Sequence, residues 1–277
     1  MKIGIIGTGS MGSVLTSSLI RSGAVSANHV TISNRTIEKA QALADSFPGI
    51  RVSAHNAETA KESDIIFLCV KPLEYKTVID EIRPVILKEQ ILVSITSPVL
   101  IHHLEELLPC KIAKVIPSIT NYELSGAILC MYSERMNEED RKGLEQLLGG
   151  IGVPIRIPES HTRIASDLSS CGPAFLGYFV EKLVDAAVDV AGMPREQANQ
   201  LIGEMVLGTG KLLTSGGFTP ETLQERVSVP GGITAVGLNM LKNELNGIFH
   251  ELVRTTQRKY EDDIGKVESI LYGTRVD

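Results

Sequence analysis

The sequence predicts an α/β domain with a mostly parallel sheet, followed by a domain made only of helices. Short apolar runs alternate with helix-forming stretches up to about residue 157, as in βαβ units. After Pro158 the strand pattern stops and long helical patterns follow. The chain of 277 residues is long enough for two ordinary domains. We therefore expect one domain over residues 1–159 and a second over 160–277.

The first predicted strand leads directly into a glycine pattern. The apolar run 2–6 is followed by Gly7, Gly9 and Gly12, spaced as G-x-G-x-x-G, and the next ten residues form a helical pattern. This order of strand, glycines and helix is typical of a Rossmann-type dinucleotide-binding domain. Gly7 allows the tight turn, Gly9 the approach of a pyrophosphate, and Gly12 the packing of helix on strand. The alternative is a tight strand-to-helix turn that binds no ligand.

The end of the second strand indicates which dinucleotide is bound. A strand is expected at 30–33 and a helix at 36–46, with Thr36 as its N-cap. Between them lie Asn34 and Arg35, where an NAD site usually has an acidic residue for the ribose. An arginine binds a 2′-phosphate bidentately, whereas a carboxylate would repel it. The sequence therefore favours NADP, with NADPH preferred over NADH; the alternative is that Arg35 simply faces solvent.

The remaining elements of the first domain follow the same alternation. Apolar runs of this kind are typical of parallel strands buried on both faces. The predicted strands cover 65–70, 91–95, 112–116, 127–132 and 153–157, and the predicted helices cover 75–82, 100–107 and 138–148.

The second domain is predicted to contain helices alone. A short helix is expected at 160–170, and the helix that starts at Gly172 is apolar around most of its girth. Such a helix is buried in a core or between subunits, and so small a domain favours burial against a second copy. Thr219 and Pro220 are expected to begin a later helix, as N-cap and first residue. Further helices are expected from about 193 to 214, from about 234 to 245, and from there to about 272.

Composition excludes several classes of partner. A net charge of −6 without a basic run argues against nucleic acid. No apolar run approaches the roughly 20 residues that a membrane helix needs. The beginning of the sequence lacks a signal-peptide cleavage pattern, so a cytoplasmic location is expected. Four cysteines and six histidines are scattered without the spacing of metal ligands, so no metal is expected.

Several stretches together resemble the pyrroline-5-carboxylate reductase family over nearly the whole chain. The N-terminal fingerprint is joined by His55-Asn56 with Glu58-Thr59, by Val70-Lys71-Pro72, by Gly172-Pro173-Ala174 and by Pro230-Gly231-Gly232 with Thr234. The last two stretches are the most specific, because they recur at this separation in that family's helical domain. Within the family the sequence is similar to a branch associated with competence operons.

The resemblance implies an activity, an assembly and a set of site residues. Family members transfer a hydride from NADPH or NADH to the C=N bond of pyrroline-5-carboxylate, which gives proline. They form an intertwined homodimer, often assembled further, whose active site lies where the helical domain of one subunit meets the partner. The implied cofactor residues are Ile6, Gly7, Thr8, Gly9, Ser10, Met11, Gly12, Asn34, Arg35, Asn56, Val70, Lys71 and Pro72. The implied substrate residues are Val229, Gly231, Gly232, Ile233 and Thr234, with Thr234 as the candidate catalytic residue.

Elementary chemistry agrees with these implied roles. An imine accepts hydride poorly until its nitrogen is protonated, so a hydrogen-bond donor such as Thr234 beside that nitrogen is useful. The substrate carboxylate needs an anion site, and backbone N–H groups of a glycine-rich loop at a helix start supply one. The alternative role for Thr234 is that of a helix N-cap, which is common for threonine after such a loop.

The sequence departs from the family mainly on the substrate side. Val229 stands where the family usually has a serine whose hydroxyl contacts the substrate carboxylate. Ser170 and Ser118 fall at two further changed positions, and Thr96-Ser97-Pro98 replaces a turn of small residues. These changes keep two alternatives open, a paralogue that acts on another imine or keto substrate and a non-catalytic NADP-binding regulatory protein. A β-hydroxyacid dehydrogenase is disfavoured, because Lys182 is followed four residues later by Ala186 and not by that family's asparagine.

Overall fold

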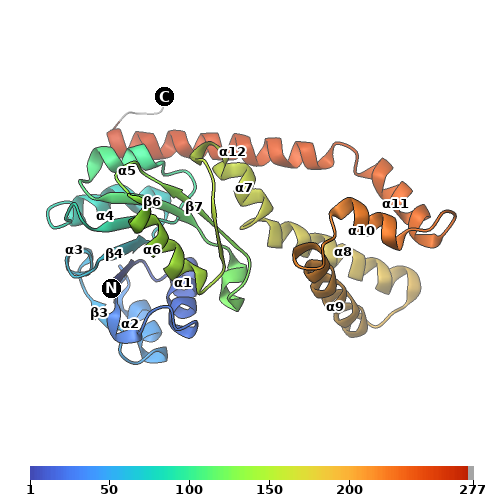
Figure 1. The fold of residues 1–277 in the computed structure, drawn as a ribbon, viewed down its shortest axis with the longest axis horizontal. Helices are drawn as coiled ribbons and strands as arrows, with labels where there is room; N and C mark the ends of the chain where they lie inside the picture. Colours follow the sequence, from blue (N-terminus) through green and yellow to red (C-terminus); the bar gives the residue numbers. More distant parts are fainter. Residues whose placement is uncertain (274–277) are drawn as a thin grey trace. The chain divides into compact units, whose positions relative to one another are not determined.

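The structure, a computed structural model, describes residues 1–273 and forms two compact units. Among the described residues, the first unit comprises Met1–Pro173 and 255–273, and contains one eight-stranded sheet (Figure 1). Its strands are β1 (Ile3–Ile6), β2 (Val30–Ser33), β3 (Arg51–Ser53), β4 (Ile65–Leu68), β5 (Ile91–Ser94), β6 (Lys111–Ile116), β7 (Ala127–Tyr132) and β8 (Val153–Arg156). Their order in the sheet is β3-β2-β1-β4-β5-β6-β7-β8.

The sheet is mostly parallel, as the sequence predicts. The strands from β3 to β6 run parallel to one another, β7 is antiparallel to β6, and β8 is parallel to β7. In the central strand β4 every residue is buried, which explains its unbroken apolar run. The predicted Rossmann-type domain is therefore confirmed.

Helices cover both faces of this sheet (Figure 1). One face packs against α1 (Ser10–Arg21), α2 (Ile37–Ser46) and α6 (Glu138–Gly149). The other face packs against α3 (Asn56–Lys61), α4 (Tyr75–Ile82), α5 (Ile101–Leu107) and the end of α12 (Ile248–Tyr272). Alternate strand residues supply the two cores, so Ile5 and Phe67 face the first layer while Ile66 and Leu68 face the second.

Two local features differ from the sequence prediction. The strand β3 and the helix α3 lie in a stretch where the sequence predicts no element. For β3 the reason is its pattern: it has three residues, and of these only Ser53 is buried. Such a strand has no apolar run to reveal it. Thr36 occupies the N-cap position of α2, but its side chain makes no capping hydrogen bond.

The second unit, Ala174–Arg254, contains only helices. They are α8 (Gly172–Ala191), α9 (Arg195–Thr214), α10 (Pro220–Val227), α11 (Ile233–Glu244) and the first residues of α12. The expected start of α10 is confirmed: Thr219 is its N-cap, and its side-chain oxygen accepts from the backbone N–H of Thr222 at 3.2 Å. The all-helical second domain is thus present.

The compact units do not divide at the predicted boundary between residues 159 and 160. The helix α7 (Thr162–Leu168) belongs to the sheet unit, because Thr162 is buried against Met131 of β7 and Ala165 packs on the same core. The last turns of α12 also belong there, since Val267 and Leu271 are buried in that core. The division therefore falls within α8 and within α12.

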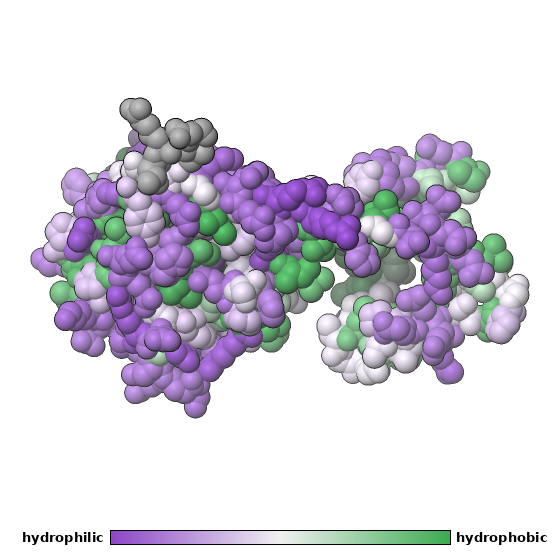
Figure 2. Space-filling model, turned by 90° about the horizontal axis from the view of Figure 1, so that it is seen from above, coloured by the Kyte–Doolittle hydropathy of each residue, from purple (hydrophilic) through white to green (hydrophobic). Residues whose placement is uncertain are grey.

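Apolar side chains remain uncovered on the helical unit. The sequence predicts burial of α8, yet in this single chain Val184 is the buried residue of that helix. Leu176 is 50% exposed and Leu183 is 59% exposed, and hydrophobic side chains reach the surface of this unit in Figure 2. Burial in the unit's own core is therefore wrong for most of α8. None of the helices within residues 1–273 is long and apolar enough to cross a membrane.

Candidate functional site

A cavity of about 690 Å³ opens at the carboxyl edge of the sheet. The ends of three strands lie in register there, because Ile6 pairs with Ser33 on one side and with Leu68 on the other. In open parallel sheets, ligands bind outside the carboxyl ends of the strands where the strand order reverses. That reversal occurs at β1, between β2 and β4. The cavity therefore lies where a dinucleotide is expected.

The turn from β1 into the first residues of α1 requires glycine at two positions. Gly7 has φ of +99°, and a Cβ there would lie 2.7 Å from the carbonyl oxygen of Cys69. A Cβ on Gly12 would lie 2.0 Å from the carbonyl oxygen of Gly7. Around Gly9, in contrast, no atom lies within 4 Å of a built Cβ. The backbone is therefore closely packed at Gly7 and Gly12 and open at Gly9, and the open position lets a phosphate approach the backbone closely.

The same loop offers unused hydrogen-bond donors. Gly9 is the N-cap of α1 and has no side chain to satisfy the first N–H groups of that helix. Within the described residues, the buried hydroxyl of Thr8 has no hydrogen-bond partner. The N–H of Thr8 donates to Oδ1 of Asn34 at 3.0 Å, which ties the loop to the end of β2. These groups fit a pyrophosphate at the positive end of the helix.

Arg35 and Lys39 place two positive charges beside the cavity. Arg35 is 86% exposed, lines the cavity, and pairs through Nη1 with Oε1 of Glu74 at 2.8 Å. Lys39 lines the same cavity from the first turn of α2. Arg35 therefore faces solvent, as the alternative expects, and its side chain also lines the cavity. Lys39 is not among the predicted residues, and its spacing from Arg35 gives no helical signal, because Arg35 precedes the N-cap Thr36 of α2.

Asn56 is held by two hydrogen bonds at the cavity wall. Its Oδ1 accepts from the hydroxyl of Ser33 at 2.8 Å, and its Nδ2 donates to Oε2 of Glu81 at 2.6 Å. The amide is therefore oriented before any ligand binds. Glu74 and Glu81 also line the cavity but are not among the predicted site residues. Glutamates on a surface helix are common, so their presence in the sequence does not indicate a binding site.

The structure gathers most, but not all, of the predicted cofactor residues around this cavity. Eight of them line it, namely Ile6, Gly7, Gly9, Asn34, Arg35, Asn56, Val70 and Lys71. Five others lie outside the lining, namely Thr8, Ser10, Met11, Gly12 and Pro72. Thr8 is buried within the loop, while Ser10, Met11 and the buried Gly12 begin α1.

The predicted substrate residues come together at the start of α11 in the helical unit. Gly231 has φ of +76°, and the N–H of Gly232 donates to the carbonyl of Val229 at 2.9 Å. Val229 is 63% exposed and Ile233 is 94% exposed. Gly232 is the N-cap of α11, and Thr234 is the exposed second residue of that helix. The alternative role of Thr234 as N-cap is therefore wrong.

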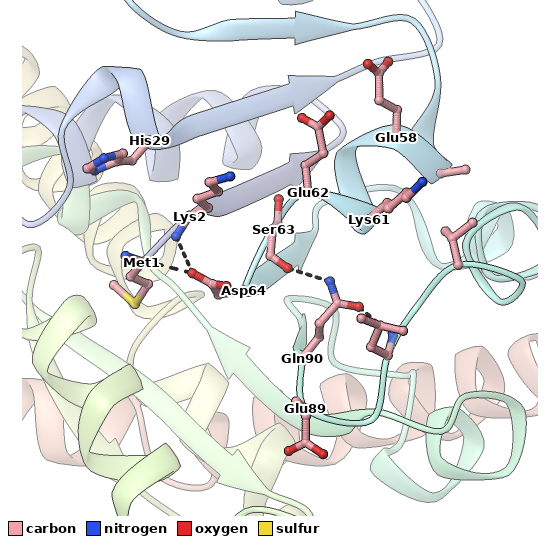
Figure 3. A pocket seen from close by; sticks show the side chains of 13 residues that line it. Met1, Lys2, His29, Glu58, Lys61, Glu62, Ser63, Asp64, Glu89 and Gln90 are labelled. Atoms are coloured by element: carbon pink, nitrogen blue, oxygen red, sulfur yellow. Dashed lines mark hydrogen bonds and ion pairs between the residues drawn. The ribbon is translucent and has the colours of Figure 1, made fainter.

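A second hollow, of about 1010 Å³, lies at the opposite edge of the sheet (Figure 3). Two hydrogen bonds join polar groups of its lining: the N–H of Lys2 donates to Asp64 at 2.7 Å, and the amide of Gln90 donates to the carbonyl of Ser63 at 2.6 Å. Within residues 1–273, no group of three His, Cys, Asp or Glu side chains is arranged to hold a metal ion. This hollow faces the amino ends of the strands, so we do not assign it to the dinucleotide.

Comparison with protein families separates the two parts of the chain. Residues 2–98 match the family model described as NADP oxidoreductase, coenzyme F420-dependent. Residues 159–262 match the model described as pyrroline-5-carboxylate reductase dimerisation. The first match contains the glycine loop and Arg35, and the second contains the loop at Val229.

Individual relatives cover almost the entire chain. ComE operon protein 4 of Bacillus subtilis is 40% identical over 97% of this chain and 98% of its own length. Pyrroline-5-carboxylate reductase 3 of the same organism is 32% identical over 96% of this chain and 98% of its own length. The crystal structure of Plasmodium falciparum pyrroline carboxylate reductase with NADP bound superposes with a TM-score of 0.82 at 26% identity, covering 98% of both chains. The chain belongs to the pyrroline-5-carboxylate reductase family.

Proposed function

We propose that this chain is an NADPH-dependent reductase of a cyclic imine and that it converts pyrroline-5-carboxylate to proline. The observation that carries the proposal is the open glycine loop at the carboxyl edge of the sheet, in a chain 32% identical to a named pyrroline-5-carboxylate reductase. Bound NADPH would supply the hydride that reduces the C=N carbon. The protein supplies binding, orientation and a proton donor.

The residues divide these tasks between the two units. In the sheet unit, the start of α1 would hold the pyrophosphate, and Arg35 with Lys39 would hold the 2′-phosphate. In the helical unit, the N–H groups at the start of α11 would bind the substrate carboxylate. The hydroxyl of Thr234 would donate a hydrogen bond to the imine nitrogen and so favour attack at the neighbouring carbon.

We further propose that the active form is a homodimer or a higher homo-oligomer. The match to a dimerisation model over residues 159–262 supports this assembly. So do the exposed leucines of α8, which a second copy would remove from water. The name of the 40% identical relative refers to an operon and not to a reaction. A paralogue with another imine or keto substrate therefore remains the second candidate, favoured by Val229, and a non-catalytic NADP-binding regulator the third.

Arg35 should determine the preference for NADPH. Replacing it with glutamine removes the bidentate partner of the 2′-phosphate, so we expect NADPH affinity to fall about tenfold while NADH affinity stays unchanged. Fluorescence titration of both nucleotides measures this. Arg83→Gln, at an exposed arginine outside the cavity lining, is the matched control. A wild-type protein that binds NADH more tightly, or an equal loss for both nucleotides, would contradict the role of Arg35.

Val229→Ser should strengthen binding of pyrroline-5-carboxylate. A hydroxyl at this exposed position restores a hydrogen bond to a charged group, worth about 1.5–3 kcal/mol, so the KM should fall about tenfold or more. Val227→Ser is the control, because Val227 is equally an exposed valine, two residues earlier at the end of α10. If the KM does not change, the substrate carboxylate is not bound at this loop.

A further inference from the structure

The loop between β5 and α5, residues 95–100, lies at the same sheet edge as the cavity. Ser94 ends β5 in register with Leu68 of β4, which in turn pairs with Ile6 of β1. The loop therefore leaves the sheet at the same end as the glycine loop, two strands away from it, with β4 between them. The loop holds Thr96-Ser97-Pro98, one of the departures from the family, but none of the predicted site residues, and no step of the proposed reaction uses the side chains that hold it.

The direction in which a dinucleotide would cross the strand ends decides which half of it lies near residues 95–100. Arg35 follows β2 on one side of β1, and the glycine loop follows β1 itself. A dinucleotide whose 2′-phosphate is near Arg35 and whose pyrophosphate is at the glycine loop continues toward β4 and β5. Its nicotinamide half is therefore expected on the side of residues 95–100.

Three polar contacts hold this loop. The hydroxyl of Tyr260, on α12, donates to the carbonyl oxygen of Ser97 at 3.3 Å. At the far end, the N–H of Ile101 donates to Oε1 of Glu159 at 3.0 Å, and the N–H of Leu100 donates to Nδ1 of His103 at 3.2 Å. The contacts to Glu159 and His103 fix the start of α5. Tyr260 alone among these three side chains bonds the middle of the loop, whereas the buried hydroxyl of Tyr75 bonds Oγ of Ser94, the last residue of β5, at 2.9 Å.

Tyr260 is suited to a constant donor role. The residue is half-buried, and burial together with the charge of Glu159 raises the pKa of its hydroxyl. The hydroxyl therefore keeps its proton at neutral and moderately alkaline pH. Its removal leaves no charge unpaired, because its partner is a backbone carbonyl of the half-buried Ser97.

We propose that Tyr260 is a positioning residue for the nicotinamide half of the bound cofactor: its hydroxyl fixes the carbonyl of Ser97 and thereby the course of residues 95–100. The inference rests on the proposed NADPH site. It assigns Tyr260 no contact with the reacting atoms. Loss of the hydroxyl should loosen the nicotinamide while the phosphate contacts around α1 and Arg35 persist.

Tyr260→Phe tests the proposal, with Tyr272→Phe as the matched control. Tyr272 is a second tyrosine of α12, whose hydroxyl donates to Oε2 of Glu106 on α5 at 2.6 Å. For Tyr260→Phe we expect an NADPH dissociation constant within about twofold of wild type, because the phosphate contacts dominate affinity. The fluorescence of bound NADPH, which reports the surroundings of the nicotinamide, should lose at least about half its enhancement. The kcat should fall about fivefold, the value of one ordinary hydrogen bond. Tyr272→Phe should leave all three unchanged.

Each alternative outcome has a distinct meaning. Normal NADPH binding by the wild type with unchanged fluorescence and kcat in Tyr260→Phe overturns the role of Tyr260 and leaves the proposed function standing. Equal changes in both tyrosine variants show a general effect of α12 and also overturn it. A wild type that does not bind NADPH contradicts the proposed function and this inference together. Ser97→Gly, which loosens the same loop without altering α12, should reproduce the signature even if Tyr260→Phe folds poorly.

Discussion

Gly12→Ala is expected to abolish NADPH binding and to destabilise the sheet unit. Its Cβ would lie 2.0 Å from the carbonyl oxygen of Gly7 and 3.1 Å from Cβ of Cys69. A backbone oxygen cannot yield by a rotamer change, so α1 must move away from β1 and the phosphate loop must open. We expect NADPH affinity to fall more than about hundredfold, or about 2.7 kcal/mol, and the melting temperature to drop by several degrees.

Gly9→Ala separates cofactor binding from folding. Apart from Gly9 and its two chain neighbours, no atom of residues 1–273 lies within 4 Å of a Cβ at this position, so this variant should keep the wild-type melting temperature. The added methyl instead occupies the space that the pyrophosphate needs, and NADPH affinity should fall about as far as in Gly12→Ala.

Gly143→Ala is the control for both variants, because Gly143 is an exposed glycine inside α6 with open space at its Cβ. It should bind NADPH normally and gain up to about 1 kcal/mol of stability, since alanine favours the helix. Thermal unfolding and NADPH titration of the three variants measure these effects. Normal NADPH binding by Gly9→Ala would mean that no phosphate approaches this loop.

Glu159→Ala is expected to be the most destabilising of the charge-removing variants considered. The ammonium of Lys114 is fully buried on β6 and donates to Oε1 of Glu159 at 3.1 Å. Removing one partner of a buried pair leaves an uncompensated charge, which costs about 3 kcal/mol. The control is Glu138→Ala, which breaks an ion pair with Arg156 in which both side chains are at least 43% exposed. That change should cost less than about 1 kcal/mol.

The pH dependence of Glu159→Ala identifies the buried lysine as the cause. Burial lowers the pKa of Lys114 from its usual value of about 10.5, and the charge of Glu159 opposes this shift. Without Glu159 the folded chain should release that proton at still lower pH, while the unfolded chain keeps it up to about pH 10. The unfolded state then binds more protons, so the stability of the variant should rise between neutral pH and about pH 10.

Urea unfolding at two pH values measures this recovery. The double variant Glu159→Ala with Lys114→Met should recover the part of the loss that the buried charge causes at neutral pH, while the hydrogen bond from the N–H of Ile101 to Glu159 stays lost. A double variant as unstable as the single one would show that the pair does not cause the loss.

The architecture could be predicted because its signals are local. Each central strand is buried on both faces, and the run at Ile65–Leu68 shows this directly in its residue types. The glycine loop was predictable for the same reason, since the turn and the helix start follow each other in sequence. The short strand at Arg51–Ser53 was not, because its half-exposed pattern carries no apolar run.

Features that depend on the packing of distant segments could not be predicted. Glu74 and Glu81 reach the cavity only because α4 packs beside the ends of β1 and β4, and nothing in their neighbours indicates this. The assignment of α7 and the end of α12 to the sheet unit rests on contacts such as that of Val267 with the sheet core. The contact of Thr162 with Met131 joins residues 31 positions apart, and Val267 lies more than a hundred positions after the strands it covers, so no short window of sequence contains these contacts. The position of Thr234 one residue inside α11 similarly depends on where Gly232 begins the helix.

The most direct test of the central claim is the rate of NADPH oxidation by the purified wild-type chain with pyrroline-5-carboxylate. We predict turnover that forms proline in equal amount to the NADPH consumed, and no turnover in Gly9→Ala. NADPH binding without oxidation at saturating pyrroline-5-carboxylate would contradict the proposed reaction. It would point instead to another substrate or to a protein that binds the cofactor without turning it over.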